Sequence, residues 1–268
     1  MYIFETHAHF DDEQFDNDRD ELLNSLPAHA ISPVINVGAS MDSARASFDL
    51  AKKYLHVFAA LGVHPSDIDT LDDEGMSWMR KAAGDPKAAA IGEIGLDYYW
   101  EKDEIQQKRQ QQCFATQLEL ARDVDLPVII HSRDACEDTL NILMDAIDKG
   151  TRGVMHCFSY SPEIAEKYVK KGFYLGIGGV VTFKNSKKLK ETVTRFPLSC
   201  MVLETDCPYL APEPFRGSRN DSTYLPYVVS AIAKLKQTTE EEVIEVTTAN
   251  AKRLFSKAAR FSPSGKKQ

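Results

Sequence analysis

The chain begins MYIFETHAH, residues 1–9, where a short apolar run ends in two histidines. The same pattern recurs in PVIIH at 127–131 and in GVMH at 153–156, and two further apolar runs carry carboxylates. The residues concerned are His7, His9, Glu93, His131, His156 and Asp206. In a parallel β/α barrel, all strand ends of one polarity meet on one face, where active sites are built. The pattern therefore predicts one metal site assembled from across the chain.

Apolar, strand-like runs alternate with amphipathic stretches along the whole sequence. The predicted strands are 2–7, 33–38, 56–63, 88–94, 127–132, 153–157, 172–177 and 200–205. The predicted helices are 16–27, 42–54, 74–84, 103–124, 136–148, 161–171, 186–196, 223–236 and 239–255. Asp134 and Glu137 have the spacing of a capping box that would open the helix after His131. Eight strands, each followed by a helix, predict an α/β protein with a TIM-type (β/α)8 barrel.

The alternative architecture is a doubly wound open sheet, which would gather its ligands near one switch point. Here the ligands come from strands 1, 4, 5, 6 and 8, and this spread favours a closed barrel. With no low-complexity linker in the sequence, we expect a single barrel domain over residues 1–258 and a flexible tail over 259–268.

Composition narrows the class of protein. The chain has 268 residues, 43% of them hydrophobic, and no long uncharged apolar run, so neither a transmembrane helix nor a signal peptide is expected. Its five cysteines show no CxxC spacing, which favours free thiols in a reducing cytoplasm. A net charge of −8 disfavours bulk electrostatic binding of nucleic acid. It does not exclude a nuclease, because a divalent cluster with a few arginines can hold phosphate locally.

His7 and His9 are two residues apart on a strand, so both imidazoles leave the same face and can chelate one ion. Glu93 sits between glycines on a buried apolar strand, where a carboxylate needs a cation. Its two oxygens suit it to bridge two ions; the alternative is a buried ion pair with an arginine. His131 and His156 each follow three apolar residues in successive β/α units, which favours ligation over a satisfied core histidine.

Asp206 follows LETD's glutamate by two residues, so Glu204 and Asp206 point the same way. Asp206 is nearer the strand end and is the expected ligand and proton acceptor. Glu204 is expected either to orient a histidine or to contribute to a further ion.

Several residues near the same strand ends are candidates for substrate contact. They are His64, Arg133, Arg216, Arg219 and Asn220. His64 could hold a phosphate or protonate a leaving group, and the alternative is an ordinary loop histidine. Arginines in these loops could clamp an anion, or could simply be solvated or ion-paired. Tyr98, Tyr99 and Trp100 could stack a base or pack their own loop.

The sequence resembles the TatD family of metal-dependent DNases, within the amidohydrolase-like barrels. The resemblance covers nearly the whole chain. It rests on THAHFDD at 6–12, GVHP at 62–65, AIGEIGLDYY at 90–99, PVIIHSRDA at 127–135, HCFS at 156–159, LETDCPYLAP at 203–212, RGSRN at 216–220 and TTANAKRLF at 247–255. It implies a TIM barrel, divalent-metal hydrolysis of phosphodiesters and DNase activity of the 3′–5′ exonuclease type. The resemblance implies that the metal-site positions are His7, His9, Glu93, His131, His156 and Asp206.

Two departures from the family pattern stand out. Phe10 replaces the usual leucine of the first motif, and Asp221-Ser222 replaces the usual Glu-Pro after RGSRN. The second departure falls in a loop expected to touch substrate, so it bears on substrate preference.

The expected mechanism is two-metal hydrolysis of a phosphodiester. His7, His9 and Asp206 would hold one ion, His131 and His156 the other, and Glu93 would bridge; Asp206, Glu93 and His64 are the expected catalytic residues. The ions would activate a water molecule, with Zn, Mn or Mg as the candidates. The expected substrate is DNA or an oligonucleotide, single-stranded, without membrane involvement, and the protein is expected to be a monomer or weak oligomer.

Two other functions fit the same residues. The first is a metal-dependent amidohydrolase or lactonase acting on a small carbonyl substrate, although that class often carries a carbamylated lysine where this chain has Glu93. The second is a non-catalytic metal-binding protein, which would use up its coordination positions.

Overall fold

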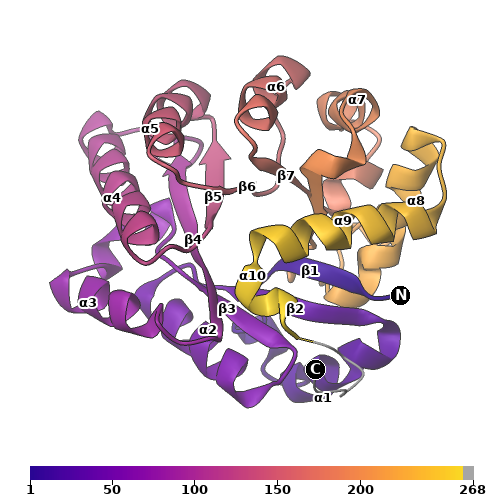
Figure 1. Cartoon of the computed structure of the whole chain (residues 1–268), viewed down its shortest axis with the longest axis horizontal. Coiled ribbons are helices and arrows are strands. Elements are labelled where there is room, and N and C mark those ends of the chain that lie inside the picture. The colour runs from indigo at the N-terminus through magenta and orange to yellow at the C-terminus, as the bar shows by residue number, and fades with distance from the viewer. Residues whose placement is uncertain (262–268) are drawn as a thin grey trace.

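The structure, a computed structural model that describes residues 1–261, contains one sheet of eight parallel strands in the order β1 to β8 (Figure 1). The strands are β1 Ile3–Ala8, β2 Ile31–Val37, β3 Val57–Leu61, β4 Ala88–Asp97, β5 Val128–Arg133, β6 Gly153–Met155, β7 Tyr174–Ile177 and β8 Met201–Leu203. The predicted TIM-type barrel is confirmed, and the open-sheet alternative is wrong because each strand pairs with its sequence neighbours throughout.

Helices surround the strands, as Figure 1 shows. They are α1 Arg19–Ser25, α2 Met41–Lys53, α3 Asp73–Ala82, α4 Glu104–Asp123, α5 Cys136–Asp148, α6 Pro162–Lys170, α7 Lys187–Arg195, α8 Leu225–Lys236, α9 Glu240–Leu254 and α10 Ser256–Ala259. In the part of the chain that the structure describes, none of these helices combines the length and apolar character needed to cross a membrane. All five cysteines are free thiols.

The barrel closes between β1 and β8 through a short parallel bridge from Ala8 to Cys207. The His9 amide donates to the Cys207 carbonyl at 2.8 Å, and the Asp206 amide donates to the His7 carbonyl at 2.9 Å. The seam therefore lies at the carboxyl ends of both strands, and it brings His7, His9 and Asp206 together.

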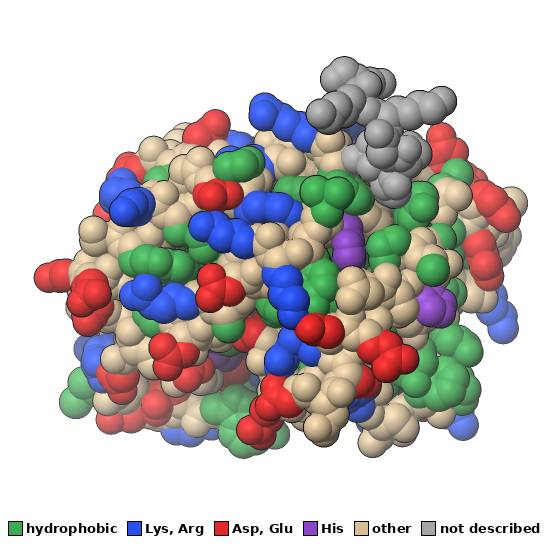
Figure 2. Space-filling view, turned by 90° about the horizontal axis from the view of Figure 1, so that it is seen from below, with side chains coloured by type: hydrophobic (Ala, Val, Ile, Leu, Met, Phe, Trp, Pro, Cys, Tyr) green, Lys and Arg blue, Asp and Glu red, His purple; other side chains and the backbone are tan. Residues whose placement is uncertain are grey.

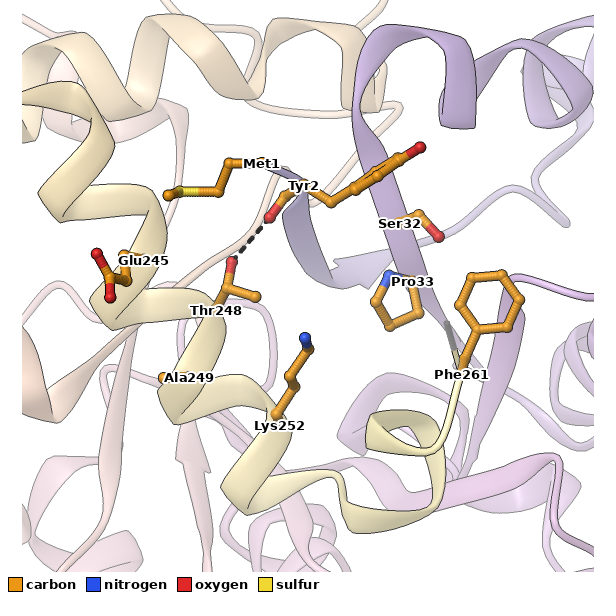
Figure 3. A pocket seen from close by; sticks show the side chains of 9 residues that line it. All are labelled: Met1, Tyr2, Ser32, Pro33, Glu245, Thr248, Ala249, Lys252 and Phe261. Carbon is orange, nitrogen blue, oxygen red and sulfur yellow. Dashed lines mark hydrogen bonds between the residues drawn. The ribbon is translucent and has the colours of Figure 1, made fainter. Parts of the chain in front are cut away.

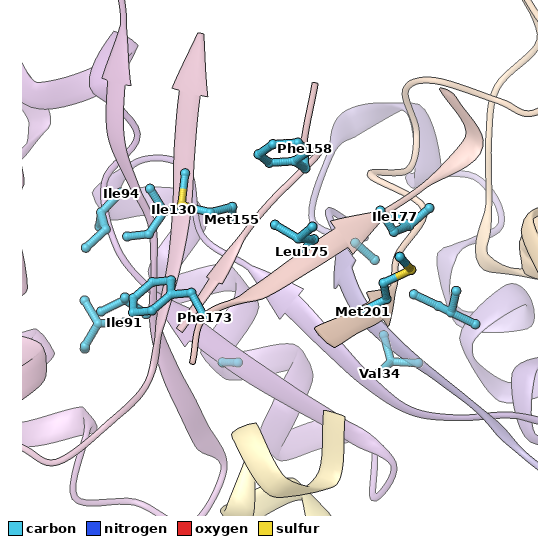
Figure 4. Close-up of a cluster of buried hydrophobic side chains, with 14 of the residues drawn as sticks. Val34, Ile91, Ile94, Ile130, Met155, Phe158, Phe173, Leu175, Ile177 and Met201 are labelled. Carbon is cyan, nitrogen blue, oxygen red and sulfur yellow. The ribbon is translucent and has the colours of Figure 1, made fainter. Parts of the chain in front are cut away.

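Apolar side chains fill the barrel and the layer between strands and helices. Figure 4 shows part of this core, with Ile91, Ile130, Phe173, Leu175 and others projecting between the strands. A second cluster, which includes Phe4 and Phe255, lets α9 and α10 cover the amino-terminal ends of the strands. Because both faces of a parallel strand are covered, the strands are apolar almost continuously, and β4 is buried over its whole length.

Three strands end two residues earlier than predicted, and the first of them, β3, ends at Leu61. β6 ends at Met155 and β8 at Leu203, so His156 and Asp206 follow their strands instead of closing them. Cys157 and Asp206 have φ of 43° and 59°, a left-handed conformation that a strand cannot continue through. The predicted capping box is wrong: α5 has Ala135 at its N-cap with no side-chain cap hydrogen bond.

A cavity of about 260 Å³ lies at the amino-terminal end of the barrel (Figure 3). Tyr2, Pro33, Lys252 and Phe261 are among the residues that line it, and its position is opposite to the predicted metal site. Phe261 also packs edge-on against Phe58, so the described chain stays against the barrel past residue 259, where the tail was predicted to begin. The rest of that predicted tail, 262–268, lies outside the described residues.

One face of the molecule carries mixed charge. On the face that Figure 2 shows, Lys and Arg side chains are interspersed with Asp and Glu, without a continuous field of one sign. Electrostatic attraction of a polyanion by this whole face is therefore not expected, and any anion site must be local.

Candidate metal centre

The six predicted ligands lie together at the carboxyl ends of the strands. They come from β1 (His7, and His9 just after it), β4 (Glu93), β5 (His131) and the residues just after β6 and β8 (His156 and Asp206). His7 is fully buried, and the side chains of His131 and Asp206 are each only 17% exposed. The structure therefore brings together residues up to 199 positions apart, from His7 to Asp206, in a single cluster.

Glu93 stands at the centre of the cluster and divides its two carboxylate oxygens between two groups of histidines. Oε2 lies 3.4 Å from Nε2 of His7 and 3.7 Å from Nε2 of His9. Oε1 lies 2.8 Å from Nδ1 of His131 and 3.8 Å from Nε2 of His156. One oxygen towards each histidine group is the arrangement that a bridging carboxylate requires.

Asp206 faces both groups. Its Oδ1 lies 3.4 Å from Nε2 of His9, 3.6 Å from Nε2 of His156 and 3.7 Å from Nε2 of His7. Donors bound tetrahedrally at about 2.0–2.2 Å from one ion are about 3.3–3.6 Å apart, so these spacings suit shared coordination. Three sets of residues have donor atoms within 4.8 Å of one another and could hold a metal ion. They are His7–His9–Glu93, His7–His156–Asp206, which shares His7 with the first set, and His64–Asp97–His131.

A glycine allows β4 and β5 to bring Glu93 and His131 this close. Gly95 pairs with His131 and has φ of +149°, and a Cβ built there would lie 1.9 Å from the His131 carbonyl oxygen. Any side chain at residue 95 would therefore push the two strands apart and separate the two ligands.

The carboxylates make the centre strongly attractive to positive charge. Burial lowers the pKa of His156, but Glu204, Glu93 and Asp206 outweigh it and raise that pKa to about 10. For His9, burial is again outweighed, here by Asp206 and Glu93, and the pKa rises to about 9. Burial opposes ionisation of Glu93, yet His156 and His7 hold its pKa well below its ordinary value. A buried site that retains this much negative charge fits divalent cations.

Two ligand histidines hydrogen-bond through their other ring nitrogen, and a third has a carboxylate within ion-pair distance. Nδ1 of His9 lies 2.8 Å from the Val37 carbonyl, and Nε2 of His131 lies 3.1 Å from Oδ2 of Asp97. Glu204 was predicted either to orient a histidine or to bind a further ion. The structure places its Oε1 3.1 Å from Nδ1 of His156, in the orienting position.

Asp97 and Glu5 were not singled out from the sequence as site residues. Asp97 lies four residues after Glu93 on the same side of β4, and this even spacing was the available signal. Glu5 precedes His7 by two residues on β1 and is fully buried, and burial raises its pKa to about 7. Glu5 accepts hydrogen bonds from the Thr205 amide and hydroxyl at 3.0 and 2.7 Å, and so it ties β1 to the segment after β8.

Of the predicted substrate residues, His64 lies nearest the cluster. Its ring is 4.3 Å from the His131 ring, edge-on, and its Nδ1 accepts a hydrogen bond from the Ser66 amide. Burial and the neighbouring His131 lower the pKa of His64 to about 3. His64 is therefore neutral at neutral pH, and its Nε2–H is a hydrogen-bond donor.

The predicted arginines differ in their surroundings. Arg133 follows His131 by two residues, and its guanidinium lies 3.9 Å from the Tyr99 ring centre. Arg216 lies 4.4 Å from the Phe183 ring centre and is exposed. Arg219 is engaged internally, because it donates to both carboxylate oxygens of Asp18 at 2.7 and 2.5 Å.

The prediction that Asn220 contacts substrate is corrected by its burial. Asn220 is 0% exposed, and its amide donates to the carbonyls of Thr205 and Tyr209 at 3.0 and 2.6 Å. In the neighbouring departure from the family motif, Ser222 is also internal, whereas Asp221 is partly exposed. Ser222 is fully buried and donates to Oε2 of Glu5 at 2.9 Å. Asn220 and Ser222 therefore stabilise the loop after β8 from inside, and neither is exposed at its surface.

Comparison with known proteins agrees with this architecture. Residues 4–256 match the family model of TatD-related DNases. The chain is 42% identical over 253 residues to the uncharacterized metal-dependent hydrolase YabD of Bacillus subtilis, covering 94% of this chain and 98% of that protein. It is 33% identical to the 3′-5′ ssDNA/RNA exonuclease TatD of Cronobacter sakazakii, covering 96% and 99%.

Solved structures show the same relationship. The crystal structure of YjjV, a TatD homologue from Escherichia coli, superimposes with a TM-score of 0.87 at 30% identity, covering 95% of this chain and 98% of that one. An organophosphorus hydrolase from Deinococcus radiodurans shares only the fold, at 14% identity and a TM-score of 0.59. From the family match over residues 4–256 and these identities, the chain belongs to the family of TatD-related DNases.

Proposed function

We propose that this protein is a divalent-metal-dependent hydrolase of phosphodiester bonds, and specifically a deoxyribonuclease of the 3′–5′ exonuclease type. The observation that carries the proposal is the position of Glu93, with one oxygen facing His7 and His9 and the other facing His131 and His156. Family membership and the exonuclease names of relatives such as the Cronobacter protein support the choice of substrate. Five free thiols support a cytoplasmic location.

The donors fit two divalent ions. His7 and His9 would hold one ion, His131 and His156 the other, with Glu93 between them and Asp206 in reach of both. Imidazole-rich ligation suits Zn²⁺ and Mn²⁺, and the carboxylates also admit Mg²⁺. When bound, such ions act as Lewis acids on a water molecule and on the phosphodiester.

The chain's own residues supply the remaining steps. Oδ1 of Asp206 faces the centre of the cluster and would orient the attacking water and accept its proton. Nε2–H of His64, neutral at neutral pH, would donate a hydrogen bond to a phosphoryl oxygen as negative charge develops. Asp97 and Glu204 would hold His131 and His156 in the tautomers that leave the other ring nitrogen free for an ion.

The test is metal-dependent cleavage of single-stranded DNA by the wild-type protein and by two variants, Glu93→Gln and Asp206→Asn. Chelator-treated protein should be inactive, and added Mn²⁺ should restore cleavage. Each substitution should lower kcat by at least about 100-fold, while far-UV circular dichroism stays unchanged. His29→Ala, at an exposed histidine on the segment Leu26–His29, is the matched control and should retain full activity.

The same preparation distinguishes the other functions. Hydrolysis of ester or lactone panels without cleavage of DNA would identify a carbonyl hydrolase instead. Metal-loaded protein that is inert toward every phosphodiester and every carbonyl substrate would identify a non-catalytic metal-binding protein.

A further inference from the structure

Two aromatic rings stand exposed beside the metal centre, although large rings are normally buried. Tyr99 is 43% exposed and Trp100 is 70% exposed, and both lie within three residues of the end of β4. Their ring centroids are 4.8 Å apart at an interplanar angle of 86°. The preceding Tyr98 instead packs against the core and donates its hydroxyl to Asp138 at 2.8 Å. The loop is therefore anchored by Tyr98, and packing does not account for the two rings beyond it.

A single carboxylate joins these rings to the metal centre. Oδ1 of Asp97 accepts hydrogen bonds from the amides of Tyr99 and Trp100 at 2.9 and 3.0 Å. Its Oδ2 lies 3.1 Å from Nε2 of His131. Gln110 fixes Asp97 in turn, because its Oε1 accepts the Asp97 amide at 3.0 Å. Asp97 thus fixes the backbone of Tyr99 and Trp100 relative to His131, a candidate metal ligand.

An arginine completes the surface. The Arg133 guanidinium lies 3.9 Å from the Tyr99 ring centre and 5.6 Å from the Trp100 ring centre. Arg133 is exposed and lies two residues after His131 on β5. Within residues 1–261, it forms no hydrogen bond or ion pair through its side chain, so its N–H groups are available to an anion. A cation beside an exposed tryptophan ring has the chemistry that recognises a phosphate together with a planar base.

We propose that Tyr99, Trp100 and Arg133 form a nucleotide subsite, in which an unpaired base of the substrate strand stacks on Trp100 and an adjacent phosphate binds Arg133. The inference rests on the proposed function and extends it to the residues that select single strands. Bases inside a duplex are already stacked on one another, so only a free or frayed strand end can offer a face to Trp100.

Binding is measured with 5′-fluorescein-labelled thymidine oligonucleotides by fluorescence anisotropy, with Mn²⁺ present and in an Asp206→Asn background that suppresses hydrolysis. Trp100→Ala should weaken binding about 5- to 100-fold, since one base–aromatic stack is lost. Trp100→Phe keeps a ring and should recover most of the affinity. Leu55→Ala, at a 74% exposed position between α2 and β3, should bind like wild type.

A second oligonucleotide of equal length, with abasic residues at its 3′ end, distinguishes binding through the base from binding through the sugar-phosphate backbone. Wild-type protein should bind it as weakly as Trp100→Ala binds the normal strand, and Trp100→Ala should cause no further loss. Arg133→Gln should weaken binding of both strands. It should also make the dependence of log affinity on log salt concentration shallower, by about the contribution of one phosphate contact.

Tryptophan fluorescence gives a readout independent of activity. The other tryptophan, Trp78, lies between the Arg45 guanidinium at 4.6 Å and the Phe48 ring at 5.9 Å. In Trp78→Phe protein, the remaining emission comes from Trp100, and the normal strand should quench it much more than the abasic strand.

The outcomes separate the two proposals. If DNA is cleaved but Trp100→Ala matches wild type on both strands, the subsite is refuted and the proposed function stands. If normal strands bind through Trp100 without ever being cleaved, the subsite stands and the nuclease function is refuted. If oligonucleotides neither bind nor are cleaved, both are refuted.

Discussion

Asp97 illustrates how much one side chain can determine at this centre. Its Oδ2 faces His131, and its Oδ1 receives the amides of Tyr99 and Trp100. When Oδ2 of Asp97 accepts a hydrogen bond from Nε2–H of His131, the other ring nitrogen carries no proton. That nitrogen, Nδ1, lies 2.8 Å from Glu93 and is free to bind an ion. Such partners of ligand histidines set the tautomer and the basicity of the ring.

Asp97→Asn tests this role with little change of shape. The asparagine Oδ1 can still accept the two amides, but an NH2 group would now oppose the Nε2–H of His131. We expect Mn²⁺ affinity, measured by calorimetric titration of chelator-stripped protein, to fall about 10- to 100-fold. Asp123→Asn, at the exposed end of α4, is the control. Unchanged affinity in Asp97→Asn would show that Asp97 has no influence on the ion.

At the scale of elements, side-chain hydrogen bonds join the segment after β8 to the segment between β1 and α1. Arg219 binds Asp18 through two hydrogen bonds, Asn220 bonds within the segment, and the Tyr209 hydroxyl donates to Asp12 at 2.8 Å. The arginine beside Asp18 lowers the pKa of that carboxyl below its ordinary value of 3.8. A lowered pKa in the folded state means that the pair stabilises the fold above about pH 4 and ceases to do so as the pH falls further.

The free energy of unfolding in urea, measured from pH 3 to pH 7, checks this anchor. Because the pair is partly exposed, Asp18→Asn should be less stable than wild type by at most about 1 kcal/mol above pH 5. The difference should shrink as the pH falls below about 4, because the wild-type carboxyl then loses its charge as well. Asp49→Asn on the exposed side of α2 should leave the wild-type curve unchanged. A difference that is independent of pH would rule out an ionic anchor.

The same elements show what the sequence can and cannot predict. The eight strands and the surrounding helices were predictable because the period of apolar residues changes between strand and helix along the chain. The strand ends at His156 and Asp206 were not, since they depend on the left-handed backbone at Cys157 and Asp206. Asn220 looked like a substrate contact because polar loop residues are usually exposed, and only the folded loop shows that Thr205 and Tyr209 consume its amide. Asp97 was missed although it lies four residues after Glu93, an even spacing that places both side chains on the same side of β4.

At the scale of the whole molecule, the seam that closes the barrel lies beside the metal centre and shares residues with it. Glu93 lies on β4, while the Ala8–Cys207 bridge that closes the sheet lies beside His7, His9 and Asp206. An ion bound between these elements would therefore link β1, β4 and the segment after β8. Ligands that bind only the folded state stabilise it in proportion to their occupancy.

Thermal unfolding of the whole protein should therefore depend on metal. At free Mn²⁺ about 100 times the dissociation constant, stability should rise by about 2.7 kcal/mol. For a chain of this size, that corresponds to a rise in Tm of roughly 5–10 °C over chelator-treated protein. Glu93→Gln should lose most of the rise and His29→Ala should keep it. An equal rise in Glu93→Gln would mean that the stabilising ion binds elsewhere.

Glu93 is proposed to bridge two ions, and anomalous diffraction from crystals grown with Mn²⁺ tests this role most directly. We predict two anomalous peaks on opposite sides of the Glu93 carboxylate, one within ligand distance of His7 and His9 and one within ligand distance of His131 and His156. A single peak that lies beyond ligand distance of Glu93, or peaks away from all four histidines, would show that Glu93 does not bridge two ions.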